Sequence, residues 1–194
     1  MEPVFQLLEA IATLEPGLRD YLYSVLKTTK PPKNEILIRE GDIARTIGFI
    51  EKGMVRGYQI EENGDEFTSW FMTAGDVFIS IKSFLTQTPA YENLVALKPC
   101  VIHSITYDQY RFALKNWPSF HQHRAELLQK YYLQSEDRHQ MRRQGAYEKV
   151  TYFIKNYPTL ESQVLDKHIA SFLNLEPHYY SEIKKQYKKN NPKG

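Results

Sequence analysis

Side chains that could contact a nucleic acid are concentrated near the end of this 194-residue chain. They lie on one short segment: His178, Tyr179, Ser181, Glu182, Lys184 and Lys185. A lysine can neutralise a phosphate, and a glutamate can accept a hydrogen bond from the amino group of cytosine. The surrounding sequence is basic, because residues 138–194 contain 11 lysines and arginines against 5 acidic residues. Charge alone does not identify the partner, since a lysine-rich tail is also typical of a solvated surface.

The spacing of apolar residues around this segment is that of a helix-turn-helix. Asn174 would occupy the turn, because asparagine is the non-glycine residue that best tolerates the left-handed conformation. Pro177 suits the first turn of the second helix. The residues expected to bury the two helices are Ile169, Ala170, Leu173, Leu175, Tyr180 and Ile183. The polar side chains named above then lie on the second helix, which in this motif enters a major groove.

Short strands joined by tight turns are predicted in the N-terminal half. Six of the nine glycines fall between Gly41 and Gly75, with short apolar runs between them. Glycine supplies the positive φ that tight turns require. Asn63-Gly64 is the strongest hairpin signal and predicts a type I′ turn between strands that end near Ile60 and begin near Phe67. The pattern predicts a compact antiparallel barrel or jelly roll.

Helices are expected on both sides of these strands. Apolar spacing predicts helix over residues 3–28, interrupted at Pro16-Gly17, and a short helix over 79–85. Nothing breaks a helix between Trp117 and Arg143, which predicts about 25 residues or about 38 Å of helix. Its apolar stripe includes Leu127, Leu128, Tyr131 and Tyr132. The stripe is compatible with packing on the chain's own barrel and with packing on a second copy. Gly145 then marks a hinge before a second, helical domain.

Several classes of protein are excluded by the composition. No run approaches the ~20 apolar residues of a membrane span, and the N-terminus lacks the layout of a signal peptide, so a cytoplasmic location is expected. The single cysteine, Cys100, excludes an internal disulfide and an all-cysteine iron–sulfur cluster within one chain. No metal site is predicted, because His121 and His123 diverge on a helix. The motifs of metalloproteases, P-loop enzymes and nucleophile-elbow hydrolases are missing, so no catalytic site is predicted.

Four turns carry a resemblance to a known family. They are Ile38-Arg39-Glu40-Gly41-Asp42, Gly48 to Arg56, Asn63-Gly64-Asp65-Glu66 and Ala74-Gly75-Asp76-Val77-Phe78. This ordered set resembles the cyclic-nucleotide-binding β-roll, in particular the effector domain of the Crp/Fnr superfamily of bacterial transcription regulators. The long helix and the helix-turn-helix follow in the order of that family, so the resemblance covers nearly the whole chain.

The resemblance implies an α+β protein with an N-terminal double-stranded β-helix or jelly roll and flanking helices. A long dimerisation helix and a helical, winged-helix-like helix-turn-helix domain would follow. The implied parts are an effector domain over 1–116, the dimerisation helix and hinge over 117–144, and a DNA-binding domain over 145–194. The implied partners are promoter DNA, a second copy joined at the stripe that includes Leu127, RNA polymerase and an unidentified small-molecule effector.

The predicted effector pocket departs from the pattern of family members that bind cAMP. Their Gly-Glu and Arg-Ser motifs fall here on Ser80-Ile81 and Tyr91-Glu92. The arginine that holds the cyclic phosphate is therefore missing, and Glu92 would repel the phosphate. We expect that cAMP is not the effector, whose identity stays unknown. An altered pocket would be lined by Ser80, Lys82, Ser83, Tyr91 and Asn93, unless these are ordinary surface and strand residues.

The predicted recognition helix also departs from the family. Relatives commonly read Ser-Arg-Ile-Arg, whereas this chain reads Ser181-Glu182-Ile183-Lys184. Glutamate cannot donate a hydrogen bond to guanine or pair with a phosphate. The first interpretation is a transcription regulator. Either its base preference has shifted, or its binding relies on contacts of Lys184, Lys185, Lys188 and Lys189 with the DNA backbone. The alternative is a cyclic-nucleotide-binding-like sensor or protein-interaction module that has lost specific DNA binding.

Overall fold

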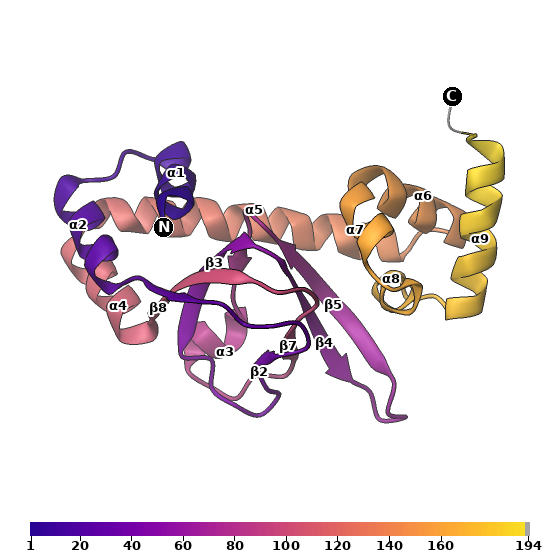
Figure 1. The fold of residues 1–194 in the computed structure, drawn as a ribbon, viewed down its shortest axis with the longest axis horizontal. Coiled ribbons are helices and arrows are strands. Elements are labelled where there is room, and N and C mark those ends of the chain that lie inside the picture. Colours follow the sequence, from indigo (N-terminus) through magenta and orange to yellow (C-terminus); the bar gives the residue numbers. More distant parts are fainter. Residues whose placement is uncertain (193–194) are drawn as a thin grey trace. The chain divides into compact units, whose positions relative to one another are not determined.

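A computed structural model describes residues 1–192 of the chain (Figure 1). The chain divides into two compact units. The first unit contains Met1–Gln59 and Trp70–Lys130, and the second contains Ile60–Ser69 and the chain from Tyr131 onward. The second unit therefore combines the C-terminal helices with a short segment of the N-terminal half. The three-part division predicted from the sequence stays a prediction.

Within residues 1–192, eight strands form two four-stranded sheets, in the order β1-β8-β3-β6 and β2-β7-β4-β5. The pairs β1–β8, β3–β8, β3–β6, β2–β7 and β4–β7 are antiparallel. The predicted jelly roll is thereby confirmed. The strands are β1 Lys27–Thr29, β2 Ile36–Ile38, β3 Thr46–Lys52, β4 Met54–Ile60, β5 Glu66–Thr73, β6 Val77–Phe78, β7 Asn93–Ala96 and β8 Val101–Thr106.

Helices precede, interrupt and follow the roll. In the first unit they are α1 Glu2–Ile11, α2 Pro16–Val25, α3 Ile81–Thr86 and α4 Tyr107–Asn116. The helix α5 spans Pro118–Arg142, close to the range predicted from the sequence. The second unit continues with α6 Ala146–Asn156, α7 Pro158–Gln163, α8 Asp166–Leu173 and α9 Pro177–Asn190. None of the described residues after β8 forms a strand. The described C-terminal helices therefore carry no wing made of strands.

The core of the first unit joins side chains from the sheets and from the helices. Phe5 and Leu18 come from α1 and α2, and Ile50, Phe84 and Leu94 come from the roll; all five are at most 1% exposed. Burial of such large apolar side chains is the main stabilising contribution to a domain of this size. The helices α1 and α2 are therefore part of the first unit rather than a separate element.

Two predictions about local structure are corrected by the structure. The helical prediction ran to residue 28, but α2 ends at Val25 and residues 27–29 form β1, paired with β8. The hairpin turn is not type I′, because positive φ occurs at Gly64 but not at Asn63. Instead the Gly64 N–H donates to the Glu61 carbonyl at 2.9 Å. That bond and the left-handed glycine are typical of a type I turn with a bulge.

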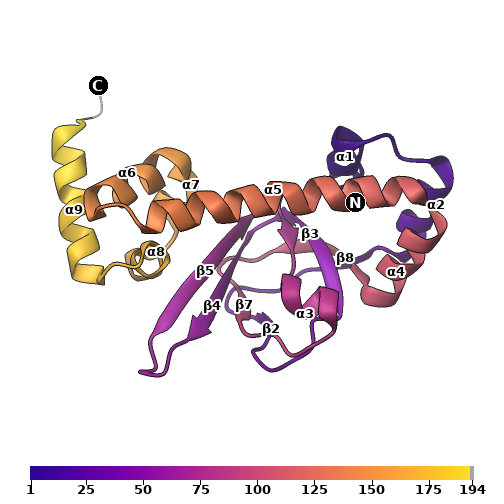
Figure 2. The same cartoon turned by 180° about the vertical axis from the view of Figure 1, so that it is seen from behind.

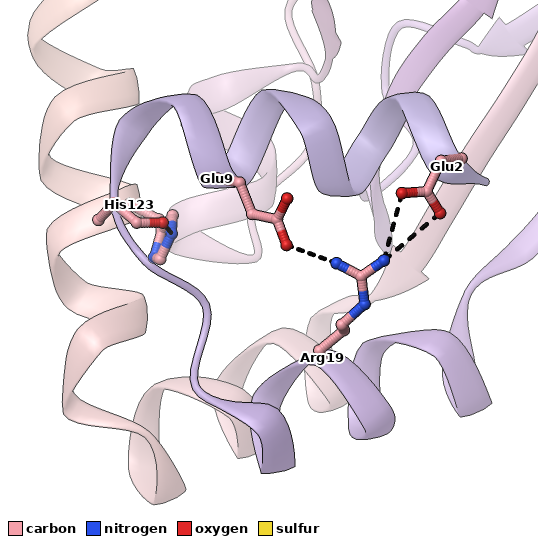
Figure 3. A network of polar contacts seen from close by, with 5 residues as sticks. Glu2, Glu9, Arg19 and His123 are labelled. Carbon is pink, nitrogen blue, oxygen red and sulfur yellow. Dashed lines mark hydrogen bonds and ion pairs between the residues drawn. The ribbon is translucent and has the colours of Figure 1, made fainter.

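Polar contacts hold α1 and α2 to each other and to α5. Arg19 on α2 donates to the carboxylates of Glu2 and Glu9 on α1 (Figure 3). His123 on α5 is fully buried, and its Nε2 lies 3.1 Å from the carbonyl oxygen of Ala12, between α1 and α2. Both views show α1 and α2 at the N-terminal end of α5 (Figures 1 and 2). The His123 contact explains why this end of α5 belongs to the first unit.

Candidate nucleic-acid interface and effector pocket

The turn between α8 and α9 has the geometry that the sequence predicts. Asn174 adopts φ 53° and ψ 57°, in the left-handed region. Its N–H donates to the Ser171 carbonyl at 3.1 Å, and the Leu175 N–H donates to the Ala170 carbonyl at 2.9 Å. These bonds satisfy carbonyl groups at the C-terminus of α8 that would otherwise lack partners. The chain can then reverse direction and begin α9 at Pro177.

Apolar packing fixes α8 and α9 to the rest of the second unit. Ile169, Ala170 and Leu173 on α8 and Tyr180 on α9 are fully buried. Burial raises the pKa of the Tyr180 hydroxyl to about 12. Ala170 has only a methyl side chain, which permits other helices of the second unit to pack closely against α8. The packing leaves the opposite side of α9 to solvent.

Four of the six predicted contact residues lie on the open side of α9. His178 and Glu182 are 88% and 59% exposed, and the His178 Nε2 atom lies 3.2 Å from Glu182 Oε1. Tyr179 and Lys185 are also exposed. Ser181 is half-buried and donates its hydroxyl hydrogen to the Pro177 carbonyl at 3.0 Å. The open face therefore presents one acid, one lysine and two aromatic rings.

Lys184 occupies a different environment from its neighbours. Its Nζ atom lies 2.8 Å from Asp166 Oδ1 and 3.0 Å from Glu161 Oε1, and the side chain is 15% exposed. Burial alone would lower the pKa of the Lys184 ammonium, but hydrogen bonds to both carboxylates outweigh burial and raise the pKa. Burial would raise the pKa of Glu161, but the charges and hydrogen bonds of Lys184 and Lys188 lower it. Lys184 thus ties α9 to α7 and α8.

The five residues predicted to line an effector pocket have two kinds of environment. Ser80, Ser83 and Asn93 are buried and bonded within the protein. Ser83 Oγ accepts from the Ala44 N–H at 2.9 Å, and Asn93 Oδ1 accepts from the Glu40 N–H at 3.0 Å. Lys82 and Tyr91 are exposed. The sequence grouped these residues, whereas the structure divides them between the interior of the roll and its surface.

Two buried ionisable side chains lie in the roll, and one of them, Glu92, occupies the position of a missing family motif. Glu92 is 1% exposed and accepts a hydrogen bond from Ser80 Oγ at 3.0 Å. Arg56 on β4 is 2% exposed, and its guanidinium lies 4.5 Å from the centroid of the Tyr58 ring. The sequence prediction missed Arg56, although an arginine inside the apolar run Met54–Tyr58 was the signal that could have found it. Buried charges are costly without compensating groups, so both side chains are candidate determinants of the pocket.

No group of histidine, cysteine, aspartate or glutamate side chains within residues 1–192 is arranged to hold a metal ion. In the same part of the chain, no helix is both long enough and apolar enough to cross a membrane.

Comparisons with known proteins agree with this architecture. A family model of the cyclic nucleotide-binding domain matches residues 29–116. No curated protein sequence gives a significant match to the chain. FixK2 from Bradyrhizobium japonicum is structurally similar with a TM-score of 0.76 and 17% identity, covering 88% of both chains.

Two further solved structures cover most of the chain. The c-di-GMP-responsive global regulator CLP from Xanthomonas campestris has a TM-score of 0.74 and 12% identity, covering 93% of this chain and 96% of that one. The catabolite activator protein of Thermus thermophilus has a TM-score of 0.57 and 17% identity, covering 93% and 86%. At these identities the likeness is one of fold. The resemblance seen in the four turns is therefore confirmed: residues 29–116 match the cyclic nucleotide-binding domain, and the chain has the fold of solved Crp/Fnr-family transcription regulators.

Proposed function

We propose that this protein is a DNA-binding transcription regulator of the Crp/Fnr type. The observation that carries the proposal is the exposed face of α9, where His178, Glu182 and Lys185 project from a helix that follows a left-handed turn. A helix presented in this way can enter a major groove and contact base edges. Such a role goes with a cytoplasmic location, where promoter DNA and RNA polymerase are found.

The proposed regulator acts as a homodimer through α5. Tyr132 and the neighbouring Leu133 are 65% and 54% exposed, and Leu127, Leu128 and Tyr131 are half-buried. Exposed large apolar residues on a long helix favour pairing with a second copy, because pairing removes their surface from water. A two-fold dimer would place two copies of α9 on one face of a duplex.

Selection from random DNA tests the proposed function. The wild-type protein should enrich a near-palindrome whose half-sites are about one helical turn apart, because a two-fold dimer requires that spacing. Binding should be compared with heparin, a polyanion without bases. Recovery of no motif at about 50 mM salt, with affinity for random duplex no better than for heparin, would overturn the proposal.

A specific observation supports a second candidate function. Glu182 is the central charge of the exposed face, and Lys184 is engaged with two carboxylates instead of facing solvent. An acidic centre favours a protein partner over a phosphate backbone. The helix-turn-helix would then be a protein-contact module, and the selection experiment separates this candidate from the first.

The effector of the proposed regulator is not cAMP. By the resemblance of the sequence, the Arg-Ser pair that holds the cyclic phosphate in family members that bind cAMP is replaced here by Tyr91 and Glu92. Glu92 is buried, and its carboxylate would repel that phosphate. We expect a dissociation constant for cAMP in the millimolar range or weaker, measured by calorimetry. A micromolar constant, or a stabilisation of about 2.7 kcal/mol at a hundredfold excess over such a constant, would contradict this prediction. Cyclic di-GMP belongs in the same titration, because the similar regulator CLP responds to it.

A further inference from the structure

The second compact unit contains a strand segment, Ile60–Ser69, as well as helices. This segment is the tip of the β4–β5 hairpin, and β5 is the outermost strand of its sheet. An edge strand leaves backbone N–H and C=O groups without partners from a neighbouring strand. Thr68 on β5 is nevertheless fully buried, so its backbone groups need partners from elsewhere.

Ser171 on α8 supplies one partner for the backbone of Thr68 and one for the backbone of Glu66. Its Oγ atom accepts a hydrogen bond from the Thr68 N–H at 2.7 Å and donates to the Glu66 carbonyl at 2.6 Å. One hydroxyl thus bonds an N–H and a C=O of the same strand, as a neighbouring strand would. Serine can do this because its hydroxyl is both a donor and an acceptor.

Arg142, the last residue of α5, supplies a third partner. Its Nη2 donates to the Thr68 carbonyl at 3.3 Å, and its Nε donates to the Phe172 carbonyl on α8 at 3.4 Å. The guanidinium also lies 4.7 Å from the centroid of the Phe67 ring. Burial lowers the pKa of Arg142 below its usual value, so the group has given up water for these contacts. Arg142 therefore joins β5, α8 and the end of α5.

A further polar contact lies on the same segment. The Nδ1 atom of His168 on α8 is 4.0 Å from Glu66 Oε2, and the His168 side chain is 12% exposed. Two residues of α8, about one helical turn apart, thus face the same stretch of β5. The contacts made by Ser171, Arg142 and His168 with residues 66–68 are called the strand clamp below.

We propose that the strand clamp is a positioning device for the DNA-binding helices. The clamp fixes α8, and α9 follows α8 because Asn174 and the buried side chains join the two rigidly. His178 and Glu182 remain largely exposed while the clamp is made, so the clamp does not block the recognition face. The hairpin tip is continuous in sequence with β4 and β5. A change in the position of those strands would therefore move the backbone that the clamp holds, and α8 with it.

The proposal rests on the proposed DNA-binding function and predicts a particular pattern of effects. Without the clamp, α8 and α9 sample several orientations, and the apparent dissociation constant rises as the fraction in the competent orientation falls. Ser171→Ala should therefore weaken DNA binding roughly five- to tenfold. The base preference and the salt dependence should not change, because Ser171 is not on the recognition face.

The experiment compares four forms of the full chain: wild type, Ser171→Ala, Ser171→Thr and Ser162→Ala. Threonine keeps the hydroxyl, so Ser171→Thr should retain both the DNA affinity of the wild type and the contacts of the strand clamp. Ser162 is the matched control, because its hydroxyl bonds within α7, to the Thr159 carbonyl. Hydrogen exchange at the Thr68 amide is the first measurement, and it needs no DNA. Exchange should be at least about tenfold faster in Ser171→Ala than in the other three forms.

The second measurement is affinity for the DNA motif selected with the wild type. Faster exchange at Thr68 together with weaker binding and an unchanged motif supports the proposal. Equal affinity of wild type and Ser171→Ala, or a changed motif, overturns it. If the wild type selects no motif, the proposed function fails, whereas the exchange measurement still decides whether the clamp exists. Should Ser171→Ala unfold, a Ser171→Thr form with wild-type exchange and weakened binding would equally overturn the proposal.

Discussion

Alanine in place of Gly53 is expected to destabilise the β-roll severely. Gly53 has φ +104°, and a Cβ at this position would lie 2.6 Å from Cys100 Sγ and 2.7 Å from both Cys100 Cα and the Pro99 carbonyl oxygen. Two of these three atoms belong to the backbone and cannot move away independently. The backbone conformation costs a side chain about 1–2 kcal/mol, and overpacking adds about 1–3 kcal/mol.

Gly64→Ala is the matched control for Gly53→Ala. Gly64 also has a positive φ, +88°, but nothing lies within 4 Å of the position that a Cβ would take. Only the conformational strain should remain, about 1–2 kcal/mol. Urea unfolding followed by circular dichroism measures both free energies. Equal stability of the two variants would show that crowding against Cys100 adds nothing to the cost of a side chain at Gly53.

This pair of glycines also shows how far the sequence can predict the roll. Both are predicted to supply positive φ in tight turns, and both do. The sequence cannot distinguish a glycine needed for space from one needed only for conformation, because Cys100 approaches Gly53 from a distant strand end. The turn at Gly64 is placed correctly but its type is not, since Asn63 has no positive φ.

Helices with strong local signals are predicted with nearly correct bounds. The helix α8 spans Asp166–Leu173 and contains Ile169, Ala170 and Leu173, which are expected to bury the first helix of the motif. The helix α5 begins and ends within one residue of its expected limits. Two short helices are missed. The helix α4 begins at a capping box, in which Thr106 and Gln109 bond each other's backbone. That signal is present in the sequence. The helix α7 has only six residues, too few for a periodic pattern.

Strands that owe their pairing to distant partners are harder to predict. All three residues of β1 are exposed, so no alternation of apolar and polar residues marks it. Its register with β8, such as Thr28 opposite His103, comes from the tertiary fold. The sequence analysis places Val77 and Phe78 in a turn, whereas the structure has them as strand β6. Two residues are too few for a strand pattern, and pairing with β3 is what makes them a strand.

The candidate sites show the same division between local and distant determinants. Helical spacing alone indicates that His178 and Glu182 share a face, and the structure has them 3.2 Å apart. Spacing cannot reveal that Lys184 pairs with Asp166 and Glu161, which come from other helices. The buried hydrogen bond from Ser80 to Glu92 likewise joins residues of two different segments, so the spacing within one helix or strand cannot reveal it. The contacts of Lys184 and Glu92 could therefore be identified only from the three-dimensional structure.

Two neighbouring lysines are expected to behave differently in DNA binding. Lys185 is exposed, so replacing it with alanine should weaken binding to all sequences and lower the slope of log affinity against log salt by roughly one unit, because one phosphate is no longer neutralised. Lys184→Gln is the control, because the ammonium of Lys184 is engaged by Asp166 and Glu161. It should lower thermal stability and leave the salt slope near that of the wild type. Titrations between about 50 and 200 mM salt measure both slopes.

Glu182→Arg is expected to change which bases the protein prefers, whereas Lys185→Ala is expected to change how strongly affinity depends on salt. In the wild type the Glu182 carboxylate, held 3.2 Å from His178 Nε2, can accept from cytosine but cannot donate to guanine. Arginine reverses this chemistry, and each good bidentate contact discriminates by about 1–3 kcal/mol. Selection with the variant should therefore replace cytosine by guanine at one position of each half-site and leave the other positions unchanged. If Glu182→Arg selects the wild-type motif while Lys185→Ala leaves the salt slope unchanged, α9 does not lie in the groove, and the protein-contact function becomes the better description of the second unit.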